Sequence, residues 1–165
     1  MDKGGFSSDG YIVDQKQLLG FPYGRYSSDW NGCGWIAAYN LLRSQGRDVS
    51  CEEIRREMSD RLRFGGFFGT SVGNVRSCLR RRGLKTALIL GKRRALSAAS
   101  KAPGGVLRFH DGEYPHYVAF SRERDGLCRF YNADSEEERY VLSMEDFYRI
   151  HVTGRFVRAL ILNKT

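Results

Sequence analysis

Cys33 is the residue of this sequence whose surroundings best suit covalent chemistry. It stands between Gly32 and Gly34, which would leave room for a substrate backbone, and an almost wholly apolar run follows as far as Leu42. The run is too long for a typical strand and predicts a helix buried on most of its surface. At a helix N-terminus, unpaired N–H groups and the helix dipole favour the thiolate, which is the nucleophilic form. Cys33 is therefore the candidate nucleophile, and a buried structural cysteine is the alternative.

A thiol nucleophile needs a base, and the base needs a third group that fixes its tautomer and ring orientation. His116 begins a predicted strand, and the next predicted strand covers residues 127–132. If the two strands pair symmetrically about Arg124, the side chains of His116 and Asn132 share one face at contact distance. A glycine bulge in the turn would shift the register and place Asp134 there instead. Asn132 and Asp134 are therefore both candidates for the third member of a triad.

The remaining histidines and cysteines are weaker candidates for chemistry. His110 precedes a turn, and His151 ends a predicted helix, where a cation suits the helix dipole. Cys51, Cys78 and Cys128 form no C-x-x-C motif and have no histidine close in sequence, so we expect no metal site. Thiol chemistry requires no cofactor, and we expect none. Without a secretion signal, we expect the thiols to stay reduced.

Hydrophobic periodicity predicts helices in the first half of the chain and strands in most of the second. We expect helices from Cys33 to near Gly46, over 51–62, from Ser71 to Gly83, over 93–101 and over 144–151, with strands over 84–90, 106–109, 116–121, 127–132, 139–142 and 156–162. Ser50-x-x-Glu53 and Ser143-x-x-Asp146 resemble capping boxes. This order predicts an α+β fold with a mainly antiparallel sheet. Residues 1–28 are expected to form an extended lead-in across the surface, and residues 29–165 a single domain.

Composition limits the classes of function. The 165-residue chain carries 27 basic and 19 acidic residues, a net charge of +8, and 41% apolar residues, as in ordinary globular domains. No apolar run is long enough to cross a membrane, and Met1–Asp9 has no hydrophobic signal core. We therefore expect a cytoplasmic protein without a membrane partner. The arginine clusters indicate a solvated helix face rather than nucleic-acid binding, since no nucleic-acid motif accompanies them.

The chain resembles the papain-like cysteine peptidases in the order of its cysteine, histidine and amide or acid. Asn31–Gly–Cys–Gly opens a buried helix, and His116–Tyr–Val–Ala–Phe opens a strand. The resemblance is to the bacterial domains that cut double-glycine leaders and to their stand-alone relatives, and it extends from about Asp29 to Leu162. It includes Gly69–Thr–Ser and Leu142–Ser–Met–Glu–Asp–Phe. The resemblance implies a papain-like fold in which an N-terminal helical part, with the nucleophile helix, packs on the sheet.

The sequence departs from this family's pattern in two places. Such peptidases usually carry a glutamine six residues before the cysteine to help form the oxyanion hole, and Ser27 occupies that position here. Asn31 could supply the side-chain donor instead, together with the Cys33 backbone N–H. The Asp–Pro that commonly follows the histidine strand is replaced by Asn132–Ala–Asp134. Because amide third members exist in papain-like enzymes, Asn132 is the first choice and Asp134 the alternative.

The leading hypothesis is a cysteine hydrolase that cleaves a peptide or amide bond through an acyl-enzyme intermediate. Cys33 would attack, His116 would transfer the proton, Asn132 would orient His116, and the loop 64–68 would form a wall of the substrate cleft or an anchor for the core. Acyl transfer to an amine is possible on the same scaffold. A catalytically inactive papain-like module that binds a peptide or partner is the alternative from another class, and a nucleic-acid-binding domain is the third. The sequence indicates no particular oligomeric state.

Overall fold

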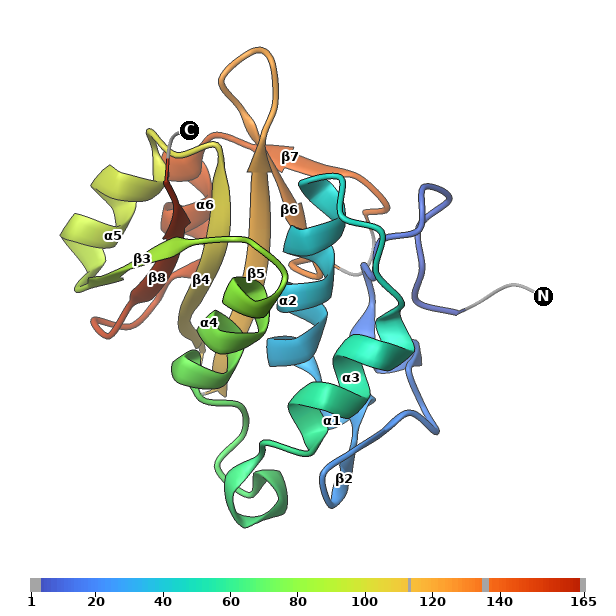
Figure 1. Ribbon diagram of the computed structural model, residues 1–165. Helices are drawn as coiled ribbons and strands as arrows, with labels where there is room; N and C mark the ends of the chain where they lie inside the picture. The colour runs from blue at the N-terminus through green and yellow to red at the C-terminus, as the bar shows by residue number, and fades with distance from the viewer. Residues whose placement is uncertain (1–3, 113, 135–136, 164–165) are drawn as a thin grey trace.

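The computed structural model describes residues 4–112, 114–134 and 137–163 and has the predicted α+β fold (Figure 1). The helices are α1 (Ser28–Asn31), α2 (Cys33–Ser44), α3 (Cys51–Ser59), α4 (Val72–Arg81), α5 (Lys92–Ala99) and α6 (Met144–His151), with 3-10 turns η1 (Gln15–Gln17) and η2 (Arg63–Gly66). The strands are β1 (Pro22–Tyr23), β2 (Tyr26–Ser27), β3 (Thr86–Leu90), β4 (Gly104–Asp111), β5 (Tyr114–Arg122), β6 (Cys128–Tyr131), β7 (Tyr140–Leu142) and β8 (Arg158–Leu162). The predicted order of helices and strands is confirmed.

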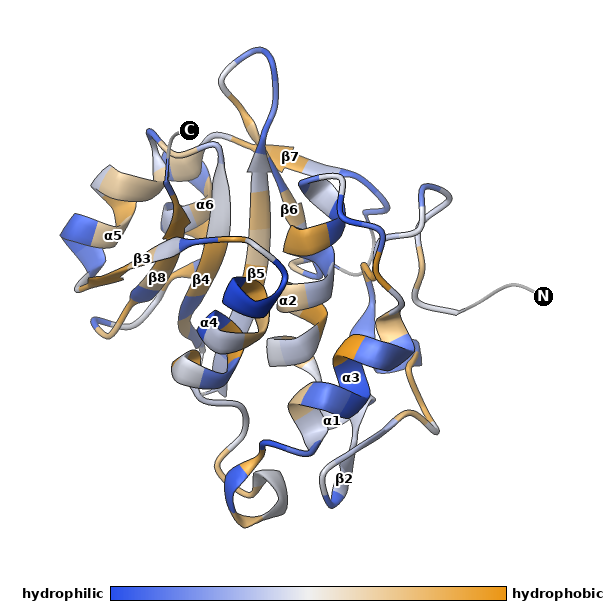
Figure 2. Ribbon diagram, viewed as in Figure 1, coloured by the Kyte–Doolittle hydropathy of each residue, from blue (hydrophilic) through white to orange (hydrophobic). Residues whose placement is uncertain are grey.

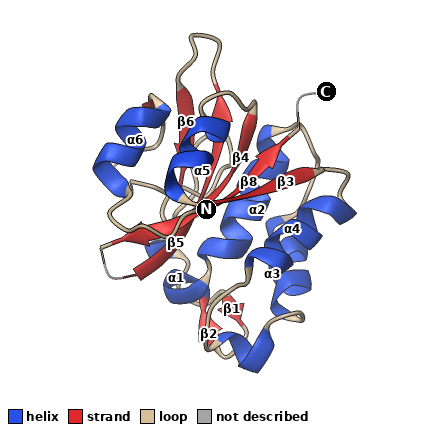
Figure 3. Cartoon of the chain, turned by 90° about the vertical axis from the view of Figure 1, so that its left-hand side faces the viewer, coloured by secondary structure: helices blue, strands red, loops and turns tan. Residues whose placement is uncertain are grey.

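Within the described residues, the main sheet has six strands in the order β3–β8–β4–β5–β6–β7, and every neighbouring pair is antiparallel. The helices α2 and α4 cover one face, and α5 and α6 cover the other (Figure 3). Alternate residues of a strand point to opposite faces. On β5, Tyr117 and Ala119 therefore join the core under α2, whereas Val118 and Phe120 join the core under α5 and α6.

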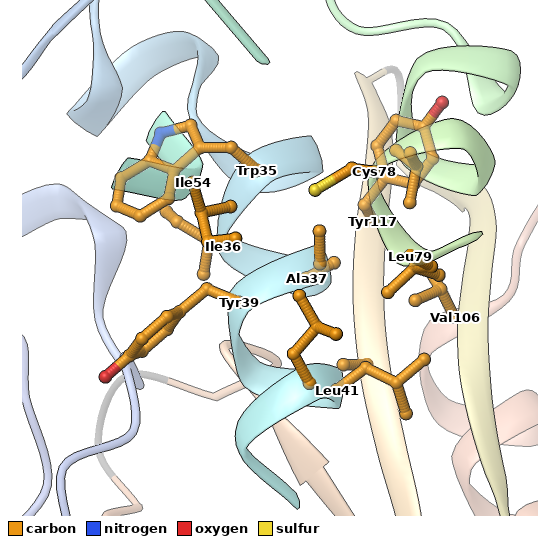
Figure 4. Close-up of a cluster of buried hydrophobic side chains, with 14 of the residues drawn as sticks. Trp35, Ile36, Ala37, Tyr39, Leu41, Ile54, Cys78, Leu79, Val106 and Tyr117 are labelled. Atoms are coloured by element: carbon orange, nitrogen blue, oxygen red, sulfur yellow. The ribbon is translucent and has the colours of Figure 1, made fainter. Parts of the chain in front are cut away.

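Helix α2 is the central element of the first core. Its residues from Gly34 to Leu42 are all buried, which explains why the apolar run has no polar face. Figure 4 shows side chains from this helix among those of α3, α4, β4 and β5, and the labelled residues are Trp35, Ile36, Ala37, Tyr39, Leu41, Ile54, Cys78, Leu79, Val106 and Tyr117. Burying each large apolar side chain stabilises the fold by about 1.5–3 kcal/mol. This packing fixes the position of the helix N-terminus, where Cys33 lies.

Residues 4–28 pack into the same core as α2. Ile12, Leu18 and Tyr23 are completely buried, so this segment contributes to the interior as well as crossing the surface. Asn40, the polar exception in the apolar run, accepts a hydrogen bond from the Ile12 N–H at 2.9 Å and donates one to the Ile12 carbonyl at 2.8 Å. The amide of Asn40 thus satisfies both main-chain groups of a buried residue and ties the segment to α2.

The serines before the helices differ in their capping bonds. Ser71 and Ser143 accept hydrogen bonds from the N–H groups of Asn74 and Asp146, as expected for N-caps. Ser50 makes no such side-chain bond, and the capping box predicted there is wrong. Its partner Glu53 pairs with Arg82, the residue directly after α4, at 3.2 Å.

Helix α3 is also shorter than the predicted 51–62. It ends at Ser59 because the chain tightens into turns, in which the N–H of Arg61 bonds to Met58 and that of Leu62 bonds to Ser59. Figure 2 shows that much of α3 is hydrophilic. Its Glu57 pairs with Arg81, the last residue of α4, and with Arg82 directly after it, the latter at 2.5 Å. Across the described residues, no helix has both the length and the apolar character needed to span a membrane.

Replacement of Asn40 by alanine tests the link between α2 and the N-terminal segment. The substitution leaves the Ile12 N–H and carbonyl buried without their partner, and each such group costs about 1–3 kcal/mol. We expect the free energy of unfolding to fall by about 2–4 kcal/mol, as measured by urea titration. Gln17→Ala is the control, because Gln17 is exposed and, within the described residues, its side chain donates a hydrogen bond to Asp14. A loss below about 0.5 kcal/mol for Asn40→Ala would contradict this account.

Candidate active site

Cys33, His116 and Asn132 line one cleft, of about 790 Å³. Cys33 is the first residue of α2, His116 lies near the start of β5, and Asn132 directly follows β6. The packing of α2 on β5 brings the first two together, and the pairing of β5 with β6 brings the third. Three segments that are far apart in sequence therefore meet at one end of the sheet.

The surroundings of Cys33 favour its thiolate. Burial acts to raise the pKa of Cys33, but a hydrogen bond and the positive charge of His116 oppose this effect, as do the backbone N–H groups of Tyr117 and Gly34. The result is a pKa below the ordinary value for a cysteine. The position at the start of α2 acts in the same direction, because the helix dipole stabilises negative charge there.

The surroundings of His116 favour its protonated form. Burial acts to lower the pKa of His116, but the hydrogen bond and negative charge of Cys33 raise it, followed by the backbone carbonyl of Asn132 and the charge of Asp111. The net shift is upward. A lowered thiol pKa beside a raised imidazole pKa favours a thiolate–imidazolium pair, the form in which cysteine nucleophiles react.

Strands β5 and β6 pair in the register that a glycine bulge in the turn would produce, and not in the register symmetric about Arg124. Phe120 lies opposite Phe130, so the register symmetric about Arg124 is wrong. Residues 123–127 join the strands, and the N–H of Glu123 bonds to the carbonyl of Leu127 at 2.8 Å. Gly126 in this loop has a φ of 84°, and a glycine in this conformation produces a bulged hairpin. The glycine in the turn therefore decides the register.

This register does not carry the pairing on to Asp134, because β6 ends at Tyr131 and Asn132 adopts a left-handed φ of 60°. The turn directs the main-chain carbonyl of Asn132 toward His116, and its oxygen lies 2.9 Å from Nε2. The side-chain contact between Asn132 and His116 that the symmetric register implied is replaced by this main-chain contact. Asp134 is half-buried, and after burial its charge is the next cause of the raised pKa of Tyr140 in β7.

Gln15 is a cleft residue that the sequence analysis missed. The amide of Asn132 accepts a hydrogen bond from the Gln15 N–H at 3.0 Å and donates one to the Gln15 Oε1 at 2.8 Å. The Gln15 Nε2 donates to the carbonyl of Asp29 at 3.1 Å. No motif spacing relates Gln15 to Cys33 or His116, because the three meet only through tertiary packing.

The two candidates for the oxyanion donor occupy different surroundings. Asn31 lines the cleft, and its Nδ2 donates one hydrogen bond to the carbonyl of Gly66 at 2.9 Å. An amide nitrogen carries two hydrogens, and within the described residues Gly66 accepts only one of them. Ser27 is the N-cap residue of α1, and its hydroxyl lies 3.5 Å from the carbonyl of Leu18. Among the described residues, Asn31 lines the cleft, whereas Ser27 does not.

The glycines beside Cys33 are required by protein packing, which corrects the expectation that they leave room for a substrate. A Cβ at Gly32 would lie 2.4 Å from the carbonyl oxygen of Ser28, and one at Gly34 would lie 2.6–2.8 Å from three side-chain atoms of Thr70. Thr70 is itself fixed, since its carbonyl accepts a hydrogen bond from Tyr117 at 2.7 Å and its hydroxyl lies 2.7 Å from that of Tyr23. These contacts hold the loop before α4 against the nucleophile helix.

The aromatic loop between α3 and α4 stands at the cleft and outside the core. Phe64, Phe67 and Phe68 are 65–76% exposed, so they do not anchor the interior. Phe67 and Phe68 line the cleft, together with the exposed rings of Trp30 and Tyr114. Apolar side chains that converge on a groove are typical of ligand-binding sites.

The other titratable candidates lie outside this constellation. His151 contacts Asp111 at 3.5 Å and the hydroxyl of Tyr140 at 3.0 Å. Burial raises the pKa of Cys78 to about 11 and is the first cause of the raised pKa of Cys128. In the part of the chain that the structure describes, no group of three or more histidine, cysteine, aspartate or glutamate side chains is arranged to hold a metal ion.

Comparison with known proteins identifies the fold. No family model and no curated protein matches the chain. Among solved structures, the peptidase domain of Streptococcus ComA, a bi-functional ABC transporter involved in a quorum-sensing pathway, matches with a TM-score of 0.59. The identity is 16%, over 83% of this chain and 94% of that one. The chain has the fold of a peptidase domain.

A second solved structure supports this assignment. A double-glycine-motif protease from an AMS/PCAT transporter, in complex with the leader peptide, matches with a TM-score of 0.51. The identity is 17%, over 80% of this chain and 84% of that one. The resemblance to double-glycine leader peptidase domains that the sequence motifs suggested is therefore confirmed at the level of the fold.

Substitution of Gly34 tests the packing around Cys33. In Gly34→Ala the new methyl group overlaps Thr70, and we expect the free energy of unfolding to fall by about 1–3 kcal/mol in urea titrations. Gly73→Ala is the matched control near the start of α4, where the nearest atom would lie 3.8 Å from the new Cβ. Helix propensity predicts a gain of up to about 1 kcal/mol for that variant. Equal effects of the two substitutions would show that Thr70 does not constrain Gly34.

Proposed function

We propose that this protein is a cysteine peptidase that cleaves a peptide or amide bond. The observation that carries the proposal is the meeting of Cys33, at the N-terminus of α2, with His116 in one cleft, where each group shifts the pKa of the other in the direction that favours an ion pair. The contact between His116 Nε2 and the Asn132 carbonyl supports it, because this contact leaves Nδ1 as the ring nitrogen for the thiol. Asn132 is the proposed third member of the triad, acting through its main chain, and Asp134 remains the alternative.

The proposed reaction proceeds in two steps through an acyl-enzyme. The Cys33 thiolate attacks the carbonyl carbon of the scissile bond, and the resulting oxyanion accepts hydrogen bonds from the Cys33 N–H and the free N–H of Asn31. His116 gives its proton to the leaving amine as the C–N bond breaks. His116 then takes a proton from water, which attacks the thioester and releases the acid and the thiol. Asn31 is preferred to Ser27 as the donor because it lines the cleft.

A peptide is the substrate class that the surroundings favour. Both structural neighbours are described as peptidases, and one was solved with a leader peptide bound. In this chain the exposed rings of Trp30, Phe67 and Phe68 line the cleft that holds Cys33. Such rings offer apolar contact area to the side chains of an extended peptide.

The pH dependence of Cys33 alkylation by iodoacetamide tests the proposed pair. Because the pKa of Cys33 is lowered, we expect rapid alkylation to begin below the pH at which an ordinary cysteine reacts. In His116→Ala the hydrogen bond and the positive charge are lost while burial remains. The midpoint of the alkylation profile should therefore move up, by at least one pH unit. Mass spectrometry of the peptide that contains Cys33 separates its reaction from that of the other cysteines.

Two further variants distinguish the candidates for the third member. Asn132→Ala keeps the main-chain carbonyl, so we expect a smaller shift than in His116→Ala. Asp134→Ala should leave the profile unchanged, and a larger shift in this variant than in Asn132→Ala would move the third role to Asp134. If Cys33 of the wild type reacts as an ordinary thiol, the peptidase proposal fails. The cleft should then be tested as a peptide-binding site of a catalytically inactive module.

A further inference from the structure

The amide of Asn132 and the residue Gln15 are joined by two reciprocal hydrogen bonds. The Gln15 N–H donates to Oδ1 of Asn132, and Nδ2 of Asn132 donates to Oε1 of Gln15. The remaining end of the Gln15 side chain donates to the carbonyl of Asp29, just before the nucleophile helix. One glutamine therefore connects the segment after β6 with the segment that precedes α2.

Asn132 needs an external constraint to keep its conformation. Its φ of 60° is in the left-handed region, which asparagine tolerates better than most residues but which is still less favourable than an extended conformation. The ladder with β5 ends at the pair Ala119–Tyr131, so strand hydrogen bonds do not hold Asn132. The direction of its carbonyl, 2.9 Å from His116 Nε2, depends on this conformation.

The turn that presents Gln15 is itself firmly attached. Asp14 caps η1 by accepting a hydrogen bond from the N–H of Lys16 at 3.1 Å. Two residues before Asp14, both the N–H and the carbonyl of Ile12 form hydrogen bonds with the side chain of Asn40 in α2. The segment is thus fixed to the helix that carries Cys33 before it reaches Asn132. It can set the position of the His116 acceptor relative to the nucleophile.

We propose that Gln15 is a positioning residue of the active site, acting on His116 through Asn132. The inference rests on the proposed function, because it assumes that Cys33 and His116 form the reactive pair. Gln15 holds the amide of Asn132, the amide holds the left-handed turn, and the turn aims the carbonyl that orients the imidazole. The N-terminal segment is consequently part of the catalytic apparatus.

Loss of the Gln15 side chain should weaken the ion pair while leaving Cys33, His116 and Asn31 in place. Asn132 would keep its bond to the main-chain N–H of residue 15 but lose the bond from its Nδ2. The carbonyl of Asn132 would then be free to turn away from His116. An imidazolium without its acceptor is less stable, so the pKa of His116 falls and that of Cys33 rises.

The test is the pH profile of Cys33 alkylation in Gln15→Met, with Gln17→Met as the matched control. Methionine has the length of glutamine but no amide. It removes the two side-chain hydrogen bonds of Gln15, to Asn132 and Asp29, and keeps most of the side-chain volume. We expect the midpoint in Gln15→Met to rise by about one unit, which lowers the rate at acidic pH about tenfold. Gln17 belongs to the same turn but bonds to Asp14, so Gln17→Met should keep the wild-type midpoint.

A double-mutant cycle completes the test. Asn132→Gly retains the left-handed turn and its carbonyl but has no amide for Gln15, so it should shift the midpoint in the same direction. If Gln15 acts through Asn132, the double variant shifts no further than the larger single shift. Additive shifts would overturn the proposal. If Gln15→Met does not fold, Asn132→Gly alone decides, and an unchanged midpoint in that variant overturns it.

These outcomes separate the inference from the function on which it rests. A wild-type Cys33 with an ordinary alkylation profile contradicts the peptidase proposal before any variant is compared. A lowered wild-type midpoint that His116→Ala raises and Gln15→Met leaves unchanged supports the peptidase proposal and overturns the role of Gln15. A loss of stability in Gln15→Met without a change of midpoint has the same meaning, because it shows a purely structural contribution.

Discussion

The packing of α2 against β5 is the contact on which the site depends. An imidazole and a thiol form an ion pair only at hydrogen-bonding distance, and here they lie on a helix and a strand whose residues are far apart in sequence. The helix is held by side chains buried on all of its faces, so its N-terminus cannot move without disturbing the core. The same helix supplies the dipole that favours the thiolate. Helix α2 therefore both positions Cys33 and supplies the dipole that favours its thiolate.

The second constraint is the turn after β6. A strand that continued past Tyr131 would place side chains, alternately, on its two faces, whereas the left-handed Asn132 presents a carbonyl instead. A main-chain acceptor can orient an imidazole because it needs only a lone pair in the ring plane. The direction of such a carbonyl, however, depends entirely on the local backbone conformation. This explains why the side chain of Asn132 is engaged by Gln15 and does not face His116.

Much of the fold was predictable because the hydrophobic pattern is strong. The apolar run from Cys33 to Leu42 was too long for a typical strand and indicated a buried helix, and the change to a period of two after residue 105 indicated the sheet. The predictions that failed were local ones. Ser50-x-x-Glu53 has the residue types of a capping box, but Glu53 forms an ion pair with Arg82 instead. The register of the β5–β6 hairpin depended on whether Gly126 would form a bulge. Short motifs leave such choices open, and long-range contacts decide them.

By itself, the sequence determined the helix that begins at Cys33, the strand that carries His116, and the α+β order, since each follows from residue type and periodicity within one segment. Only the tertiary structure decided what meets at the cleft. It placed Asn31 at the cleft, gave His116 a main-chain carbonyl as partner, and placed Gln15 of the N-terminal segment against Asn132. The physical reason is that a hydrogen bond depends on distance and direction between atoms. That distance and direction are fixed by packing between segments that are far apart in the sequence, and no local motif in one segment specifies the other.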